Sequence, residues 1–562
     1  MYRKRTPQVN LFEASSLVPP EKAKRLQATW AERFRRDALP LIDEDRFAPM
    51  YCEGTGRPNT PVQIVLSVLV LKEMFNLTDM EALEQLEFNL LWHHALSLTP
   101  GEAHLCQKTL HNFRAGLLEY DLGRVTFQEI TDRILAALGI VVGRQRLDST
   151  HILSNIAILT RLGLFCETLR LFLTKLSQNH PRLFARVPTS LVLRYLKEDG
   201  TATRYEDARS KGSRRRLGVC ARDVYRLHRL FEETAASGLE EYGLIVRLLE
   251  EQCEVTGVAR QPGADDDDAG EGGVPVEAKK PADVSSESLQ SPHDPDVTYS
   301  NHKGKGYEVQ VAETCDESNA VEIITHVEVT NSSASDVHAT IPTINALSSR
   351  GIQPEELSAD TTYGSGENAC QAERQGTELI SPVGGSKEEV PDLSDEKRPL
   401  TAADFTIDAA FNQRSVCPAG HETIKEWEYA AKPNRWELLF DKTNCAECPL
   451  FKRCPAKFNQ RLGGYLLPVN LVSRNIELRR REEESGNFAR RYAIRAGIEA
   501  TNSELKRKHG LDKLRVRGRP RVELSVYLKA LACNIKRCNL AHYSTILSSY
   551  CVMRPIPERH PA

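Results

Sequence analysis

Apolar residues recur at helical spacing through residues 1–140, so this part of the chain is predicted to be helical. The nearly continuous apolar run 61–75 predicts a buried helix, and Thr78 is the predicted N-cap of the next one. A third helix is predicted at 107–121, and its exposed polar residues are Lys108, His111 and Arg114. This succession fits a helix-turn-helix DNA reader, and a plain helical bundle explains it about as well.

Beyond residue 140 the pattern changes. The segment 144–152 is predicted to be extended, with Asp148 at the end of a short strand. Long helical patterns run from about 160 to 255. The segment 258–298 is rich in Pro, Gly, Ser and acidic residues and predicts a linker.

Strand patterns follow the linker. The first alternates apolar residues on one face, namely Tyr307, Val309 and Val311. A second strand is predicted at 321–330, then a helix closed by Gly351, a strand ending in Asp360, a helix, and a strand at 378–383. This order predicts an α/β fold built on a sheet of mixed direction.

Composition narrows the class of protein. The 562 residues are enough for about three or four domains. A mean hydropathy of −0.42 and the lack of any apolar run near 18 residues argue against a membrane span. No apolar stretch follows the basic start, so no signal peptide is expected. The 14 cysteines, of which four cluster, are not the framework of a small secreted domain, so a reducing cytoplasm is expected.

Charge is strongly segregated although the net charge is only −3. Residues 451–540 hold 22 Lys and Arg against 8 Asp and Glu, a surplus of 14 positive charges. Residues 251–300 hold 3 against 12, a surplus of 9 negative charges. A basic run is usually only a solvated helix face, but an asymmetry of this size favours a surface that binds a polyanion.

The basic region contains one unusual helical stripe. At about 100° per residue, Tyr492, Arg495, Glu499 and Lys506 fall within roughly 60° of one another, and Asn502 lies beside them. Two cations around one carboxylate make a poor core face. They suit contacts with phosphate and with a metal ion.

Three carboxylates stand at places that suit phosphodiester chemistry: Asp148 and Asp360 at predicted strand ends, and Glu499 on the stripe. Two hard cations about 4 Å apart promote cleavage of a phosphodiester, and two or three carboxylates suffice to hold them. Each aspartate alone has an ordinary alternative, because Asp148 could cap a turn and Asp360 the helix at 365. Taken together with the stripe, the three favour catalysis.

These motifs resemble a known family. The sequences LDST around Asp148, ADTTYG around Asp360, and Y-x2-R-x3-E-x6-K from Tyr492 to Lys506 look like those of the DDE transposases of bacterial insertion sequences. The last spacing is that of the Y-R-E-K branch named after insertion sequence four. Similarity extends to the N-terminal helices, to HKGKGYEVQ and to YLKALACNIKR, and in all it spans most of residues 30–540.

The resemblance implies a ribonuclease-H-like catalytic core and specific site residues. Asp148, Asp360 and Glu499 would hold two Mg²⁺ ions, with Mn²⁺ as a possible substitute. Tyr492, Arg495 and Lys506 would contact DNA phosphates. The implied reaction is cut-and-paste transposition, in which water nicks each transposon end, a hairpin forms and reopens, and the 3′-hydroxyl attacks target DNA. The partner is double-stranded DNA, paired ends imply a homodimer, and the expected location is the cytoplasm, on the nucleoid.

The expected domain organisation follows from these readings. We expect a helical DNA-binding domain at 1–140 and a first catalytic part at 141–400. A helical insertion at 155–257 and the acidic linker 258–298 interrupt that catalytic part. A cysteine insertion at 401–470, the catalytic helix with the last part of the core at 471–545, and a tail at 546–562 follow. The spacing between the two aspartates departs from the family pattern because of the helical insertion.

The cysteine cluster predicts a metal site. Cys417, Cys445, Cys448 and Cys454 supply four thiolates, the number that closes a tetrahedral Zn²⁺ site, and His421 is a competing ligand. Four small buried residues without metal are the alternative. The spacing does not match a DNA-reading finger, so a structural zinc-binding β insertion is expected. Trp427 and Trp436 within it would either pack in the module or, as in hairpin-forming relatives, stack on a flipped base.

Two other functions remain open from the sequence. A ribonuclease-H-like nuclease without strand transfer would share the three acids. A catalytically decayed regulator that contains zinc would bind DNA without cutting it.

Overall fold

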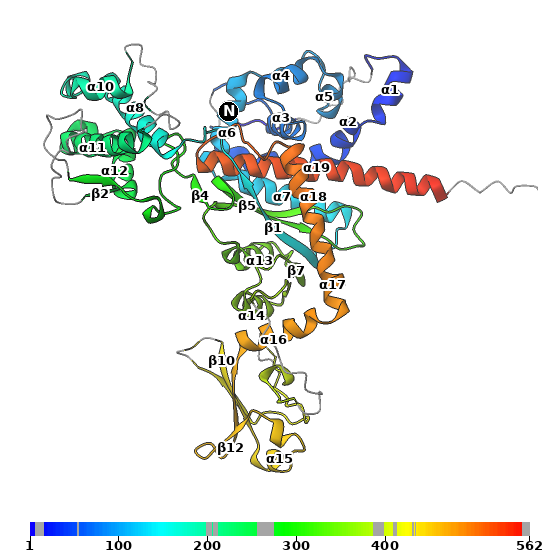
Figure 1. Cartoon of the computed structure of the whole chain (residues 1–562). Helices are drawn as coiled ribbons and strands as arrows, with labels where there is room; N and C mark the ends of the chain where they lie inside the picture. The colour runs from blue at the N-terminus through cyan, green and yellow to red at the C-terminus, as the bar shows by residue number, and fades with distance from the viewer. Residues whose placement is uncertain are drawn as a thin grey trace, which may run out of the picture.

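The computed structural model describes residues 1–5, 16–52, 56–197, 205, 212–255, 275–385, 398–408, 413–429, 432 and 434–552, with side chains as far as 539. A mixed sheet lies at the centre (Figure 1). Three lobes surround it: the N-terminal helices, a helical insertion, and a small β module at the far end from the N-terminal helices. Within the described residues, none of the helices combines the length and apolar content that crossing a bilayer requires.

The N-terminal region is helical, as predicted. Its helices are α1 (Pro20–Gln27), α2 (Trp30–Arg33), α3 (Val62–Met74), α4 (Asp79–Phe88), α5 (Leu90–Ala95), α6 (Gln107–Glu119) and α7 (Leu122–Leu138). The predicted cap of α4 is confirmed, because the Thr78 hydroxyl accepts a hydrogen bond from Glu81 N–H and the Glu81 carboxylate accepts one from Thr78 N–H.

The central sheet is mixed, as predicted. Its strands are β1 (Arg144–Ile152), β4 (Thr298–Ser300), β5 (Gly304–Thr314), β6 (Ile324–Asn331), β7 (Glu356–Ser358) and β8 (Glu378–Ile380). The order is β4-β5-β1-β7-β8, with β6 also paired to β5. β5 runs antiparallel to β1 and β6, whereas β7 lies parallel to β1 and β8.

Helices cover both faces of this sheet. Tyr307, Val309 and Val311 share one face of β5, as their alternation predicted, and pack in a core with α7 and the long C-terminal helix α19 (Arg519–Val552). Residues of opposite phase, such as Leu147 and Ala312, pack on the other face with α13 (Thr340–Ser348) and α14 (Gly366–Arg374). The period-two burial of the strands therefore builds a three-layered core.

The predicted helical stretch after β1 forms a lobe with its own core. It contains α8 (Arg161–Asn179), α9 (Pro181–Phe184), α10 (Thr189–Tyr195), α11 (Ser213–Phe231), α12 (Glu240–Gln252) and the hairpin of β2 (Cys253–Val255) with β3 (Val276–Ala278). Its buried residues form a cluster separate from those of the sheet. Residues 258–274 of the predicted acidic linker lie outside the described residues, whereas 275–298 contain β3 and a 3₁₀ turn at Pro281–Asp283 and are therefore not a plain linker.

The cysteine-containing segment forms a second insertion. It contains β9 (Lys425–Glu428), β10 (Arg435–Phe440), α15 (Lys442–Ala446), β11 (Lys457–Asn459) and β12 (Gly464–Asn470), in the sheet order β11-β12-β10-β9. α16 (Leu471–Glu483), α17 (Gly486–Ala493) and α18 (Gly497–Arg507) lead back to the central sheet (Figure 1).

Two local predictions were wrong. Asp148 lies in the middle of β1 and not at its end, because pairing with β5 continues from Gln145 to Ile152. The stripe does not lie on one continuous helix, because the turn Ile494–Ala496 between α17 and α18 is a 3₁₀ helix. A 3₁₀ turn has about three residues per turn instead of 3.6, so it changes the angular spacing between Tyr492 and Glu499.

Candidate active site

The register of two parallel strands places Asp148 and Asp360 together. Arg146 of β1 is paired with Ser358, the last residue of β7, and Asp148 and Asp360 each lie two residues farther along the chain. Side chains two residues apart project to the same side of a strand. The acids, 212 positions apart in the sequence, therefore meet at the edge where β7 ends.

Asp148 is held by two residues from the helical segment beyond α17. Arg495 Nη2 donates to its Oδ1 at 3.1 Å, and Asn502 Nδ2 donates to its Oδ2 at 3.1 Å. Its side chain is only 14% exposed. Burial raises the pKa of the Asp148 carboxyl and Asp360 adds to the rise, while Arg495 opposes it.

Glu499 approaches the same place from the first turn of α18. Arg495 Nη1 lies 3.7 Å from its Oε1, so one guanidinium bridges Asp148 and Glu499. The Glu499 side chain is 71% exposed, which leaves it accessible to a ligand. Asp360 Oδ1 accepts only from Thr362 N–H of its own turn, at 2.8 Å, and Ser365 caps α14 in its place. Asp360 is thus not the helix cap.

The other two stripe residues behave differently from each other. Tyr492 stacks on Phe488 with ring centroids 5.5 Å apart. Burial raises the pKa of the Tyr492 hydroxyl, with Arg495 opposing and the two aspartates adding to the rise, so it lies beside the acids. Lys506 lies 3.9 Å from Asp512 and makes no ion pair with any of the three acids. The structure thus gathers five of the predicted residues and leaves Lys506 at the margin.

Arg146 is a supporting residue that sequence reasoning missed. It is buried, and its guanidinium donates to Glu313 Oε1 at 2.8 Å and to the Ile494 carbonyl at 2.8 Å. Gly497 makes room for it, because a Cβ there would lie 2.1 Å from Arg146 Nη1. A buried arginine in a strand next to a carboxylate is the only sequence signal that could have indicated this role.

The four predicted zinc ligands gather at one end of the second insertion. Burial raises the pKa of the Cys445 thiol to about 11, and the nearby thiols Cys454, Cys417 and Cys448 add to the rise. The His421 backbone N–H donates to Cys417 Sγ at 3.4 Å, which leaves the His421 ring out of that contact. Trp427 is half-buried beneath Lys425, whose Nζ lies 5.6 Å from its ring centroid, and Trp436 packs at the edge of the module's core.

Among the described residues, only Glu504, His509 and Cys533 bring three metal-ligating atoms within 4.8 Å of one another. This trio is a poor metal site, because Lys536 and Arg537 already bind Glu504, at 2.7 and 3.1 Å. The four thiols do not all lie within this distance of one another.

Comparison with known families is consistent with this geometry. Residues 416–539 match a family model described as a transposase DDE domain, and residues 24–116 match one described as a transposase domain. These matches support a DDE transposase. The first spans the cysteine cluster and Tyr492 to Lys506, and the second ends within α6. Asp148 and Asp360 lie outside both matched segments.

A DDE transposase domain and the mixed sheet together fit a ribonuclease-H-like core. Neither a curated protein nor a solved structure matches the chain.

Proposed function

We propose that the chain catalyses cut-and-paste transposition of an insertion sequence of the Y-R-E-K branch. The observation that carries the proposal is the β1–β7 register, which ends two residues before Asp148 and Asp360 and so brings the two carboxyls close enough to interact. Glu499 is joined to Asp148 through Arg495. A structural ion-pair network would not need two carboxylates side by side at a strand edge with a third left exposed.

The donor set suits a hard divalent cation. Asp148 and Asp360 lie close enough to interact electrostatically, and burial raises the pKa of Asp148. Arg495 is the only cation that pairs with Asp148 within the described residues. Asp148, Asp360 and Glu499 would hold two Mg²⁺ ions, for which Mn²⁺ can substitute; when bound, such ions activate the nucleophile and stabilise the leaving oxygen.

The protein's own side chains then orient the carboxylates and the DNA. Arg495 and Asn502 fix both oxygens of Asp148. Arg495 is suited to a bidentate phosphate contact and Tyr492 to a hydrogen bond beside it. Lys506, farther along α18, supplies a point charge to the strand that enters the site. All steps are phosphoryl transfers to water or to a 3′-hydroxyl, so Tyr492 acts as a contact and forms no bond to DNA.

The proposed sequence of steps begins with a nick at each transposon end. The freed 3′-hydroxyl attacks the opposite strand and gives a hairpin, water reopens it, and the same hydroxyl joins target DNA. Two ends must be processed together, so the working complex contains at least two copies of the chain. Cys417, Cys445, Cys448 and Cys454 hold a structural Zn²⁺ that stabilises the β9–β12 module.

The test is excision of a marked DNA segment from a plasmid that carries the native flanking ends. Asp148→Asn and Glu499→Gln should each lower excision at least about 100-fold, because losing even a group that only hydrogen-bonds to a metal ligand costs 10- to 100-fold. Glu254→Gln is the matched control, since this exposed carboxylate lies in the helical insertion away from the site.

The products separate the proposal from its alternatives. Hairpin ends and joined products that depend on Mg²⁺ support transposition. Cleavage without joining would instead indicate a ribonuclease-H-like nuclease. DNA binding without cleavage by the wild type would indicate a decayed regulator.

A further inference from the structure

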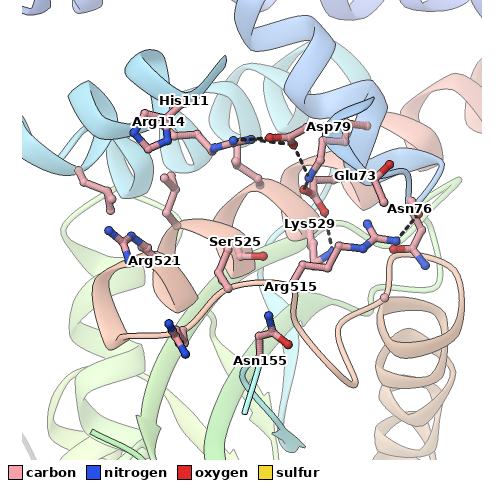
Figure 2. Close-up of a pocket in the computed structure, with 18 of the residues that line it drawn as sticks. Glu73, Asn76, Asp79, His111, Arg114, Asn155, Arg515, Arg521, Ser525 and Lys529 are labelled. Atoms are coloured by element: carbon pink, nitrogen blue, oxygen red, sulfur yellow. Dashed lines mark hydrogen bonds and ion pairs between the residues drawn. The ribbon is translucent and has the colours of Figure 1, made fainter. Parts of the chain in front are cut away.

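A cavity of about 800 Å³ lies between the N-terminal helices and the start of α19, outside the acidic site. Figure 2 shows His111 and Arg114 of α6 on one side of it, and Arg515 and Arg521 from the segment around α19 on the other. We name this cavity the basic cleft; its charged lining residues are Lys72, Glu73, Asp79, Arg114, Lys513, Arg515, Arg517, Arg521 and Lys529.

The two acids of the basic cleft are already neutralised. Glu73 is buried between Lys72 at 2.7 Å and Lys529 at 2.5 Å. Asp79 binds Arg114 at 2.5 Å and lies 3.6 Å from Lys72. The three cations at the back of the cleft, Lys72, Arg114 and Lys529, are therefore paired in salt bridges. This network also joins α3 and α4 to α6 and α19.

The cations at the cleft's mouth have no such partners. Lys513, Arg515, Arg517 and Arg521 are all exposed. Across the described parts of the chain, no acidic side chain lies within 4.0 Å of any of them. Four positive charges on one short segment create a positive electrostatic potential, and this potential attracts a polyanion to the mouth of the cleft.

The backbone that carries these cations is fixed in place. Leu153 N–H donates to the Asp512 carbonyl, Leu514 N–H to the Leu153 carbonyl, and Asn155 N–H to the Val516 carbonyl. Arg515 donates to the carbonyls of Leu77 and Asn76, at 2.5 and 2.9 Å. The segment is therefore pinned to the end of β1 and to the N-terminal helices, and its positive charges are preorganised for a ligand.

The start of α19 contributes to the positive potential. Arg521 lies in its first turn, which contains no acidic residue of its own, and Asp296 from outside the helix accepts from Arg519 N–H at 3.3 Å. The N-terminal end of a helix is itself positive, so a cation there opposes the helix dipole and a bound phosphate would relieve both. Across the cleft, His111 of α6 is exposed and lines the cavity.

We propose that the basic cleft binds the phosphate backbone of duplex DNA next to the cleavage site, with the segment 513–521 and α6 on either side of it. This inference rests on the proposed function, since it names where the same DNA substrate is held. Asn155 lines the cleft seven residues after Asp148, which limits their separation to about 25 Å, or roughly seven base pairs of B-form DNA.

The experiment measures how the affinity for a duplex of the native transposon end depends on salt, without divalent metal so that no cleavage occurs. The slope of log K against log salt is negative, and its magnitude falls by about 0.9 for each protein cation that no longer contacts a phosphate. The triple variant Lys513→Ser, Arg517→Ser, Arg521→Ser should therefore lose up to about 2.7 of that slope. Arg515 is left unchanged because it also fastens the segment.

The matched control removes the same charges elsewhere. Lys175→Ser, Arg182→Ser, Arg186→Ser changes one lysine and two arginines on the exposed face of the helical insertion. This control variant should keep the wild-type slope. The double variant Arg517→Lys, Arg521→Lys preserves the charge of the cleft and should keep the wild-type slope as well. Equal slopes for the cleft variant and the wild type would overturn the proposal, and so would equal losses in the cleft variant and the control.

The two proposals fail separately. Normal excision by the wild type with unchanged slopes contradicts the cleft alone. A slope difference with no excision by the wild type contradicts the enzyme alone. Thermal melting of each variant checks that a weaker affinity does not come from unfolding.

Discussion

The two insertions that interrupt the sheet-containing core are stabilised by different means. The helical insertion after β1 buries a large apolar cluster of its own, which includes Leu169, Phe172, Leu227 and Phe231. The β9–β12 module buries only a few apolar residues, such as Leu438, Phe440, Leu467 and Val469. Because stabilisation scales with the apolar area removed from water, packing supports the first far better than the second.

Cysteines in the two insertions differ in the same way. Cys166 and Cys220 lie in the buried core between α8 and α11, with their sulfurs 3.8 Å apart, and behave as small apolar residues. Cys417, Cys445, Cys448 and Cys454 are only half-buried and converge from separate turns. Small modules generally need a metal or a disulfide, whereas a helical lobe with its own core does not.

Removal of the proposed zinc ion should have the largest effect on stability, and it should destabilise the β9–β12 module without destabilising the helical insertion. Cys448→Ser, or a strong chelator, is expected to abolish zinc binding, because structural Zn²⁺ contributes about 10–16 kcal/mol to small zinc domains. Zinc content by elemental analysis should fall from one ion per chain to nearly none. Limited proteolysis should then cut between β9 and β12 and spare α8–α12.

Cys220→Ser is the matched control for this experiment. It removes a buried thiol of the helical insertion and should leave the zinc content unchanged. A wild-type protein without zinc, or a β9–β12 module that resists protease after chelation, would contradict the metal assignment and remove the contrast between the insertions.

A core truncation should give the next largest effect, now in the helical insertion. Phe172 is buried and packs its ring against Phe231 and Tyr242, with centroids 5.7 and 5.9 Å away. Phe172→Ala should lower the free energy of unfolding of this lobe by about 3–5 kcal/mol. Hydrogen exchange should accelerate in α8 and α11 while β1 and β5 stay protected.

Phe451→Ala serves as its counterpart in the cysteine module. Phe451 is 45% exposed and its ring meets only the edge of Tyr465 among the described rings, at 5.5 Å between centroids, so its loss should change stability by no more than about 1 kcal/mol. If Phe172→Ala speeded exchange in the central sheet as strongly as in α8, the insertion would not be a separate folding unit.

The sequence predicted local structure well and spatial convergence less well. The capped helix α4, the alternation of β5 and the mixed sheet follow from short-range patterns that act within a few residues. The position of Asp148 was missed because only the partner strand β5 decides where β1 ends. The 3₁₀ turn before Gly497 was missed because it accommodates the buried Arg146, a contact made across most of the chain.

The same limit applies to the candidate sites. Asp148, Asp360 and Glu499 could be chosen from the sequence, yet nothing local indicates that β1 and β7 share a register. The basic surplus was visible in the composition. Only the fold shows that Lys72 and Arg114 are paired with acids, whereas Arg517 and Arg521 face no acid among the described residues.

The smallest expected effect concerns an edge strand of the cysteine module. Lys425 lies over the Trp427 ring on β9, and an exposed cation–π contact contributes about 0.5–1 kcal/mol. Lys425→Ala should therefore lower the module's stability slightly, measured as the zinc-buffer concentration at which the module unfolds. Lys457 on β11, at the opposite edge of the same sheet, is exposed and faces no ring or acid within the described residues. Lys457→Ala should change nothing, whereas equal effects of both variants would mean that general charge and not the ring contact is responsible. Because such surface contacts are this weak, they add little to the small apolar core of the module, and the proposed Zn²⁺ would be its largest single stabilising contribution.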